Sequence, residues 1–211
     1  MNTVLYDYWR SSASYRVRIA LHLAGEPFES VPVDLLAGTH RAPEHLARNP
    51  QGLVPVLEID GARLTQSLAI LEYLNDTRTL SLLPENSAQR AQVRALAHSI
   101  AVDIHPVCNL SVVRHATAEA EDKHAATRAW MKHFIRPGLM AFDTLLEGFE
   151  QTPFCCGDTP SLPDLCLMPQ LYNAHRWEVD LSDHPRLQAV ETACPTHPAF
   201  AAAHPDQIRP G

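Results

Sequence analysis

The apolar pattern switches between strand-type and helix-type periodicity within the first 76 residues, which limits the chain to a small set of folds. Residues 4–6 form a short β-prone run, and residues 11–24 then carry apolar side chains at helical spacing. Gly25 and Pro27 end that helix, and residues 28–35 read as a second strand. Such strand–helix–strand units usually place two parallel strands around a crossover helix. The chain therefore begins as an α/β domain.

The same region continues with a weaker helix over 40–48, a strand over 54–59 and a helix over 67–75. Asp60-Gly61 lies between two β-prone runs, which predicts a tight hairpin at that point. The predicted element order of this domain is βαβαββα.

The composition changes after residues 84–87, which look like a linker. Beyond it, apolar residues follow helical spacing over 93–104, and further helices are expected at 125–149 and 186–194. Ser161 and Asp164 form a capping-box pattern, which predicts that another helix begins at Ser161. We predict an α/β domain over 1–80 and an all-helical domain over 88–211.

Charge and composition argue against several classes of partner. The formal net charge is −7 and lysine and arginine are not clustered, so a nucleic-acid partner is not expected. Apolar stretches are too short to span a bilayer, and the N-terminus lacks the pattern of a signal peptide. We expect no membrane contact.

The spacing of the cysteines and histidines predicts neither a disulfide framework nor a metal site. The five cysteines are an odd number without a CxxC pair, which fits a reducing cytoplasm better than a disulfide framework. The twelve histidines show no zinc-type spacing, so no metal site is expected.

Three short motifs at element ends could bind an anionic ligand. Ser11 lies at a strand-to-helix turn, where it either caps the helix or joins the helix N-terminus in stabilising an anion such as a thiolate. Pro55 follows Val54 at the start of a strand, either as an edge device or as a cis-proline. Gln66-Ser67 opens a helix, as a cap or as a carboxylate site.

Taken together, these motifs resemble the zeta class of the glutathione transferases. The signature run Ser-Ser-x-Ser-x-Arg-Val-Arg-Ile-Ala-Leu corresponds to residues 11–21. The resemblance extends over essentially the whole chain, through residues 49–55, 66–74, 109–112, 157–158, 164–167, 173–176 and 179–181. It implies a glutathione transferase fold, with a thioredoxin-like first domain and an all-α second domain, glutathione as cofactor and a homodimer.

The resemblance also assigns cofactor roles to individual residues. Ser11 would donate a hydrogen bond to the glutathione sulfur, with Ser12 beside it. The remaining cofactor contacts would be Val54 beside Pro55 for the cysteinyl unit, Gln66 and Ser67 for the γ-glutamyl carboxylate, and Gln51 and His40 for the glycyl end. For His40, a solvated loop histidine is an equal alternative.

Substrate-side residues follow in the same way. Arg176 matches an arginine that projects towards the sulfur, and Arg10 is a second carboxylate clamp. Asn109 belongs to a motif resembling enzymes of tyrosine breakdown. His105 matches a residue that lines the substrate side in maleylpyruvate isomerases, or else only accompanies a proline kink.

The implied function is glutathione-dependent cis–trans isomerisation of a maleyl diacid, preferably maleylacetoacetate. Maleylpyruvate isomerase, a general zeta-class transferase and a non-catalytic glutathione-binding module remain as alternatives. Two positions depart from the family pattern: Ala13 stands where many members carry cysteine, and Ser111 replaces an arginine of the maleylpyruvate branch.

Overall fold

The computed structural model of the chain describes residues 2–150 and 153–209. It contains two compact units. The first comprises the residues up to Ser81 together with those from Thr196 onward, and the second comprises Leu82–Pro195.

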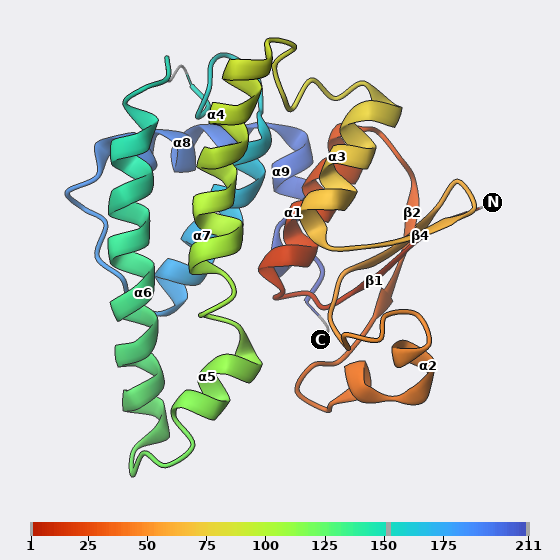
Figure 1. Cartoon of the computed structure of the whole chain (residues 1–211), viewed down its shortest axis with the longest axis vertical. Coiled ribbons are helices and arrows are strands. Elements are labelled where there is room, and N and C mark those ends of the chain that lie inside the picture. Colours follow the sequence, from red (N-terminus) through yellow and green to blue (C-terminus); the bar gives the residue numbers. More distant parts are fainter. Residues whose placement is uncertain (1, 151–152, 210–211) are drawn as a thin grey trace. The chain divides into compact units, whose positions relative to one another are not determined.

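The first unit is built on a four-stranded mixed sheet in the order β2-β1-β3-β4 (Figure 1). Strands β1 and β2 pair in parallel, whereas β1 with β3 and β3 with β4 pair antiparallel. In chain order its elements are β1 (Thr3–Asp7), α1 (Ser12–Leu23), β2 (Phe28–Pro32), a 3-10 turn (Thr39–Arg41), α2 (Pro43–Leu46), β3 (Val56–Ile59), β4 (Ala62–Thr65), α3 (Ser67–Arg78), α9 (Pro198–Ala203) and a 3-10 turn (Pro205–Gln207). Helices α1 and α3 pack side by side. The predicted thioredoxin-like βαβαββα order is confirmed.

Local chemistry sets the lengths of these elements. Asp60 and Gly61 both have positive φ, 53° and 80°, as the predicted tight hairpin requires. The strand predicted over 28–35 ends at Pro32, which pairs with Asp7, the last residue of β1. The helix predicted over 40–48 is interrupted because Ala42, which precedes Pro43, is extended.

The second unit is helical among its described residues. Its elements are α4 (Ser87–His98), a π-helical segment (Ser99–Ile104), α5 (Leu110–Ala116), α6 (Lys123–Leu146), α7 (Leu162–Arg176), α8 (Pro185–Ala193) and a 3-10 turn that starts at Cys194 (Cys194–Thr196). The helix predicted over 93–104 therefore changes type at Ser99. The His105 N–H donates to the Ile100 carbonyl at 2.9 Å, a five-residue step typical of π geometry.

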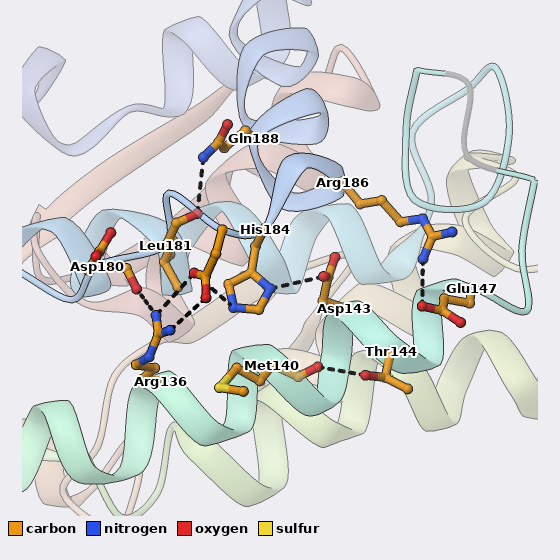
Figure 2. Close-up of polar contacts among 11 residues, drawn as sticks. Arg136, Met140, Asp143, Thr144, Glu147, Asp180, Leu181, His184, Arg186 and Gln188 are labelled. Carbon is orange, nitrogen blue, oxygen red and sulfur yellow. Dashed lines mark hydrogen bonds and ion pairs between the residues drawn. The ribbon is translucent and has the colours of Figure 1, made fainter.

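Helix α6 is fixed against its neighbours on two sides. Gly138 allows the close approach of the π-helical segment, since a Cβ there would lie 2.5 Å from the side chain of Ile104. Figure 2 shows a polar stripe of α6 facing the segment 180–188. The pairs are Arg136 with Asp183 at 2.8 Å, Asp143 with His184 at 3.0 Å and Glu147 with Arg186 at 3.1 Å. The stripe follows helical spacing and holds the α7–α8 connection.

The C-terminal segment differs from the predicted domain division. We expected residues 88–211 to form one helical domain, but α9 groups with the first unit. The physical reason is that α9 packs against α1 with Ala199, Phe200 and Ala203 buried, and the guanidinium of Arg18 on α1 donates from Nε to the Ala203 carbonyl at 3.0 Å. This bond satisfies an orphan carbonyl at the end of α9.

Helix α7 begins at a buried carboxylate. Asp164 is fully buried and accepts from the Cys155 N–H at 2.8 Å, the Ser161 N–H at 2.8 Å and the Ser161 hydroxyl at 2.6 Å. Burial raises the pKa of Asp164, and the bonds from Ser161 and Cys155 oppose that rise. The predicted capping role of Asp164 is confirmed.

We expect Asp164→Ala to lower the free energy of unfolding by about 3 kcal/mol or more, because it leaves three buried donors without an acceptor. Asp122→Ala is the matched control, since Asp122 caps α6 through the same kind of bonds on the exposed surface. Asp122→Ala should lower the free energy of unfolding by a clearly smaller amount. Urea unfolding of the three proteins measures both, and equal losses would contradict the role of burial.

Candidate active site

The direction of the strands brings three predicted motifs to one edge of the sheet. Strand β3 is antiparallel to both β1 and β4, so β1 and β4 run the same way, and both end where β3 begins. The register places Tyr6, Val56 and Thr65 side by side across the three strands. The segments that follow β1, precede β3 and follow β4 therefore meet at this edge.

Ser11 lies at the first of these segments as the N-cap of α1. Its backbone is extended, and its hydroxyl oxygen accepts from the Ser14 N–H at 3.2 Å. The Ser11 N–H donates to the Tyr8 carbonyl at 2.8 Å, which fixes the turn out of β1. A serine hydroxyl that accepts one bond still has its own hydrogen to donate. Ser11 therefore combines capping with the ability to bind an anion, and Ser12 opens the helix beside it.

Val54 and Pro55 lie at the second segment. The peptide bond between them is cis, as the thioredoxin-type interpretation expected. The preceding Leu53 carbonyl accepts from Asn49 Nδ2 at 3.0 Å and contacts His45 Nε2 at 3.0 Å. Gly52 has φ 62°, and a Cβ there would lie 3.1 Å from the His40 carbonyl. The backbone that leads into Val54 is thus fixed by side chains of the preceding segment.

Gln66 and Ser67 form the third segment. Gln66 has φ 68° and ψ 110°, a conformation that residues other than glycine rarely adopt and that is often found at functional sites. Its Nε2 donates to Gln51 Oε1 at 2.9 Å, so two predicted cofactor residues are in direct contact. The alternative of Ser67 as helix cap is wrong: Gln66 occupies the cap position, and Ser67 is the first residue of α3. The buried Ser67 hydroxyl accepts from Arg16 Nη1 at 3.2 Å instead.

The predicted substrate residues are divided between the two units. Arg10 precedes Ser11 in the first unit, with its guanidinium carbon 5.3 Å from the centre of the Trp9 ring. In the second unit, Arg176 is the exposed last residue of α7 and lies over the Trp177 ring at 4.7 Å. Asn109 caps α5, and His105 ends the π-helical segment. His40 lies in the 3-10 turn of the first unit.

The protein's own cysteines are poor nucleophiles. Cys108, Cys155, Cys166 and Cys194 are buried, and Cys156 is half-buried. Burial raises the pKa of Cys108 to about 11 and that of Cys156 to about 12, and it also raises the pKa values of Cys155 and Cys194. Burial therefore disfavours the thiolate form of these four cysteines.

Sequence reasoning missed the two arginines that support the site. In the sequence, Arg16 and Arg18 are only part of the family signature and are assigned no role, yet both side chains are 1% exposed. Arg18 pairs with Asp7 at 2.8 Å and donates to the Trp9 carbonyl at 3.0 Å. Their signal was an arginine on the apolar side of a helix, where a solvent-facing charge does not belong.

Within residues 2–150 and 153–209, no group of three or more histidine, cysteine or acidic side chains is arranged to hold a metal ion. The helices in the same part of the chain also fall short of the length and apolar character needed to cross a membrane.

Comparison with known proteins agrees with this geometry. Residues 1–76 match the family model described as the glutathione S-transferase N-terminal domain. A maleylacetoacetate isomerase from Rhizobium meliloti (strain 1021) is 61% identical over 209 residues, which cover 99% of this chain and 98% of that protein.

Two solved structures are similar over nearly their whole length. A maleylpyruvate isomerase, described as a bacterial glutathione S-transferase in the zeta class, has a TM-score of 0.93 at 38% identity and 98% coverage of both chains. A maleylacetoacetate isomerase from Anaeromyxobacter dehalogenans 2CP-1, with glutathione bound in its active site, has a TM-score of 0.87 at 41% identity, covering 99% of this chain and 97% of that one.

The fold is that of a glutathione transferase. Within that class, the chain belongs to the zeta family that contains the maleylacetoacetate and maleylpyruvate isomerases.

Proposed function

We propose that this protein catalyses the glutathione-dependent cis–trans isomerisation of a maleyl diacid, with maleylacetoacetate as the preferred substrate, in the breakdown of aromatic compounds. The meeting of the Ser11, Val54–Pro55 and Gln66–Ser67 segments at one sheet edge carries this proposal. The 61% identity to a protein named maleylacetoacetate isomerase supports the choice of substrate.

Glutathione would bind along the sheet edge. The N-terminus of α3 offers backbone N–H groups and a partial positive charge to the γ-glutamyl carboxylate, together with Gln66 and Ser67. The backbone of Val54 would pair with the cysteinyl unit beside the cis Pro55. Gln51, already joined to Gln66, reaches the glycyl end with His40.

The chemistry begins with activation of the glutathione thiol. A free thiol with a pKa of about 8.5 is only a few per cent ionised at neutral pH. The hydrogen of the Ser11 hydroxyl donates to the sulfur, since the oxygen already accepts from the Ser14 N–H. The N-terminus of α1 adds a favourable field, so both groups lower the pKa of the bound thiol.

Isomerisation then proceeds by addition and elimination. The thiolate adds to one carbon of the cis double bond, and the π electrons move onto the conjugated carbonyl oxygen as an enolate. Rotation about the resulting single bond follows. Collapse of the enolate restores the double bond in the trans form and expels the thiolate, so glutathione is regenerated.

The substrate is a dianion and the chain has a net charge of −7, so local cationic side chains would be needed to hold the diacid. Arg10 is next to Ser11 in sequence, and Arg176 offers a planar guanidinium for bidentate carboxylate binding. Both stabilise the developing enolate charge. Asn109 Oδ1 accepts from the Ser111 N–H and hydroxyl, which leaves its Nδ2 hydrogens to donate to the substrate. His105 is the remaining substrate-side residue.

Maleylpyruvate is the second candidate substrate. It is favoured by His105 and by the 0.93 TM-score to a maleylpyruvate isomerase. Ser111 in place of the arginine of that branch favours maleylacetoacetate. Ala13 in place of the usual cysteine weakens a general transferase role that depends on a second thiol. A non-catalytic glutathione-binding module would retain the cofactor without turning over either substrate.

The working form would be a homodimer, as the family resemblance implies. Its compartment would be the cytoplasm, which suits the free thiols of all five cysteines and the use of reduced glutathione. The domain division predicted at residues 80–88 keeps cofactor binding in the first domain and substrate binding mainly in the second.

We expect turnover to depend absolutely on the glutathione thiol. Maleylacetoacetate and maleylpyruvate should be assayed side by side with glutathione, with S-methylglutathione and with neither. Only glutathione should support activity, with the higher kcat/KM for maleylacetoacetate. S-methylglutathione should inhibit competitively, because it binds but has no nucleophile. Full activity without any thiol would contradict the mechanism, and glutathione binding without turnover would support the binding-module alternative.

We expect Arg176→Ala to raise KM for the diacid about ten- to a hundredfold, because a charge-assisted contact is lost. The KM for glutathione should be nearly unchanged. Arg176→Lys keeps the charge but loses the planar fork and should remain impaired. Steady-state kinetics with the two ligands varied separately measure this. A variant weakened only in glutathione binding would move Arg176 to the cofactor site.

A further inference from the structure

We propose that Arg16 and Arg18 are positioning residues that divide the glutathione site between them. Arg18 holds the Ser11 segment and so governs the ionisation of the thiol. Arg16 holds Ser67 and so governs recognition of the γ-glutamyl carboxylate. This proposal rests on the proposed function, because it assigns these two tasks within the same cofactor site.

The two guanidinium groups are unusual in their burial. Arg16 and Arg18 are each 1% exposed and are the largest fully buried side chains in the described chain. They are two residues apart on α1, which rotates their side chains by about 200° relative to each other. Arg16 therefore points towards α3 and Arg18 towards the β1 end and α9, as their bonds confirm.

Arg18 fixes the segment that leads from β1 into Ser11. Its Nη1 contacts both oxygens of Asp7, at 2.9 and 2.8 Å, at the end of β1. Its Nη2 donates to the Trp9 carbonyl at 3.0 Å, two residues before Ser11. Its Nε donates to the Ala203 carbonyl of α9 at 3.0 Å. The guanidinium thus ties the strand, the turn and the C-terminal helix into one unit around the N-terminus of α1.

Arg16 orients the Ser67 hydroxyl. A guanidinium can only donate, so the bond from Nη1 at 3.2 Å makes the Ser67 oxygen an acceptor. The single hydroxyl hydrogen is then available to a different acceptor, and a carboxylate at the α3 N-terminus is placed to receive it. The buried charge also polarises this hydroxyl. It supplies a positive field behind a carboxylate site whose residues Gln66 and Ser67 are neutral.

Stability alone does not account for two buried arginines. Replacing a buried ion pair with apolar side chains of similar volume is often neutral or stabilising, because it avoids the desolvation of the charges. The Asp7–Arg18 pair, 2% and 1% exposed, is therefore open to replacement as a unit. A role in the cofactor site explains why charged side chains occupy these buried positions. It also gives a separate prediction for each of the two arginines.

The test compares Arg16→Met, the paired replacement Asp7→Leu with Arg18→Met, and Arg63→Met as control. The paired replacement avoids leaving Asp7 buried without its partner. Arg63 lies on β4 and pairs with Glu58 at the surface, outside the proposed site. Two quantities are measured: the Kd of S-methylglutathione, which does not involve a thiol, and the pKa of the bound glutathione thiol from its thiolate absorbance. Unfolding curves report stability separately.

We expect a crossed pattern. Arg16→Met should weaken S-methylglutathione about tenfold and leave the thiol pKa unchanged. The loss of affinity caused by Arg16→Met should be smaller for a ligand whose γ-glutamyl carboxylate is replaced with a carboxamide. The paired replacement should raise the thiol pKa towards about 8.5 and change the Kd of S-methylglutathione little. Arg63→Met should change neither. Arg16→Lys and Arg18→Lys, which keep the charge, should show weaker forms of the same two effects.

The outcomes separate this inference from the proposed function. If the unaltered protein fails to bind glutathione or to lower its thiol pKa, the proposed function itself fails. If it does both, but the Met or Lys variants shift Kd and thiol pKa together in proportion to lost stability, the arginines are only structural and the division of tasks is wrong. Unchanged values in all variants would overturn it equally.

Discussion

Backbone pairing between β1, β3 and β4 is the constraint on which the cofactor site depends. Because β3 runs against both neighbours, the ends of β1 and β4 and the start of β3 fall at one edge, next to Tyr6, Val56 and Thr65. The N-termini of α1 and α3 and the start of β3 are thereby brought to the same edge. We propose that an anionic tripeptide binds there, because helix N-termini offer backbone N–H donors and a partial positive charge.

Two kinds of side-chain bond refine this arrangement. Surface-facing groups such as Ser11 and Gln66 are positioned by local geometry, a cap in one case and a left-handed φ in the other. Buried groups are positioned by other buried groups, as the Ser67 hydroxyl is by Arg16. The same division is found in the second unit, where buried Asp164 starts α7 and the α6 stripe of Figure 2 secures the segment that follows it.

Local chemistry was readable from the sequence, and long-range packing was not. The Asp60-Gly61 hairpin, the Ser11 cap and the Asp164 capping box follow from a few neighbouring residues, so they were predicted correctly. The grouping of α9 with the first unit depends on its packing against α1, which includes the bond from Arg18 to Ala203, 185 positions later, and no local pattern records such contacts. The change from α to π geometry at Ser99 was missed because apolar spacing does not distinguish the two helix types.

Because the cysteines of the chain are buried or half-buried, we propose that the reactive thiol is that of glutathione and that Ser11 favours its ionisation. The most direct measurement is the pH titration of the thiolate absorbance of glutathione bound to the unaltered protein, to Ser11→Ala and to Ser12→Ala. The account predicts a bound-thiol pKa well below about 8.5 in the unaltered protein, a clear rise in Ser11→Ala and a smaller one in Ser12→Ala. Identical pKa values in all three proteins would contradict it and leave Ser11 as a helix cap alone.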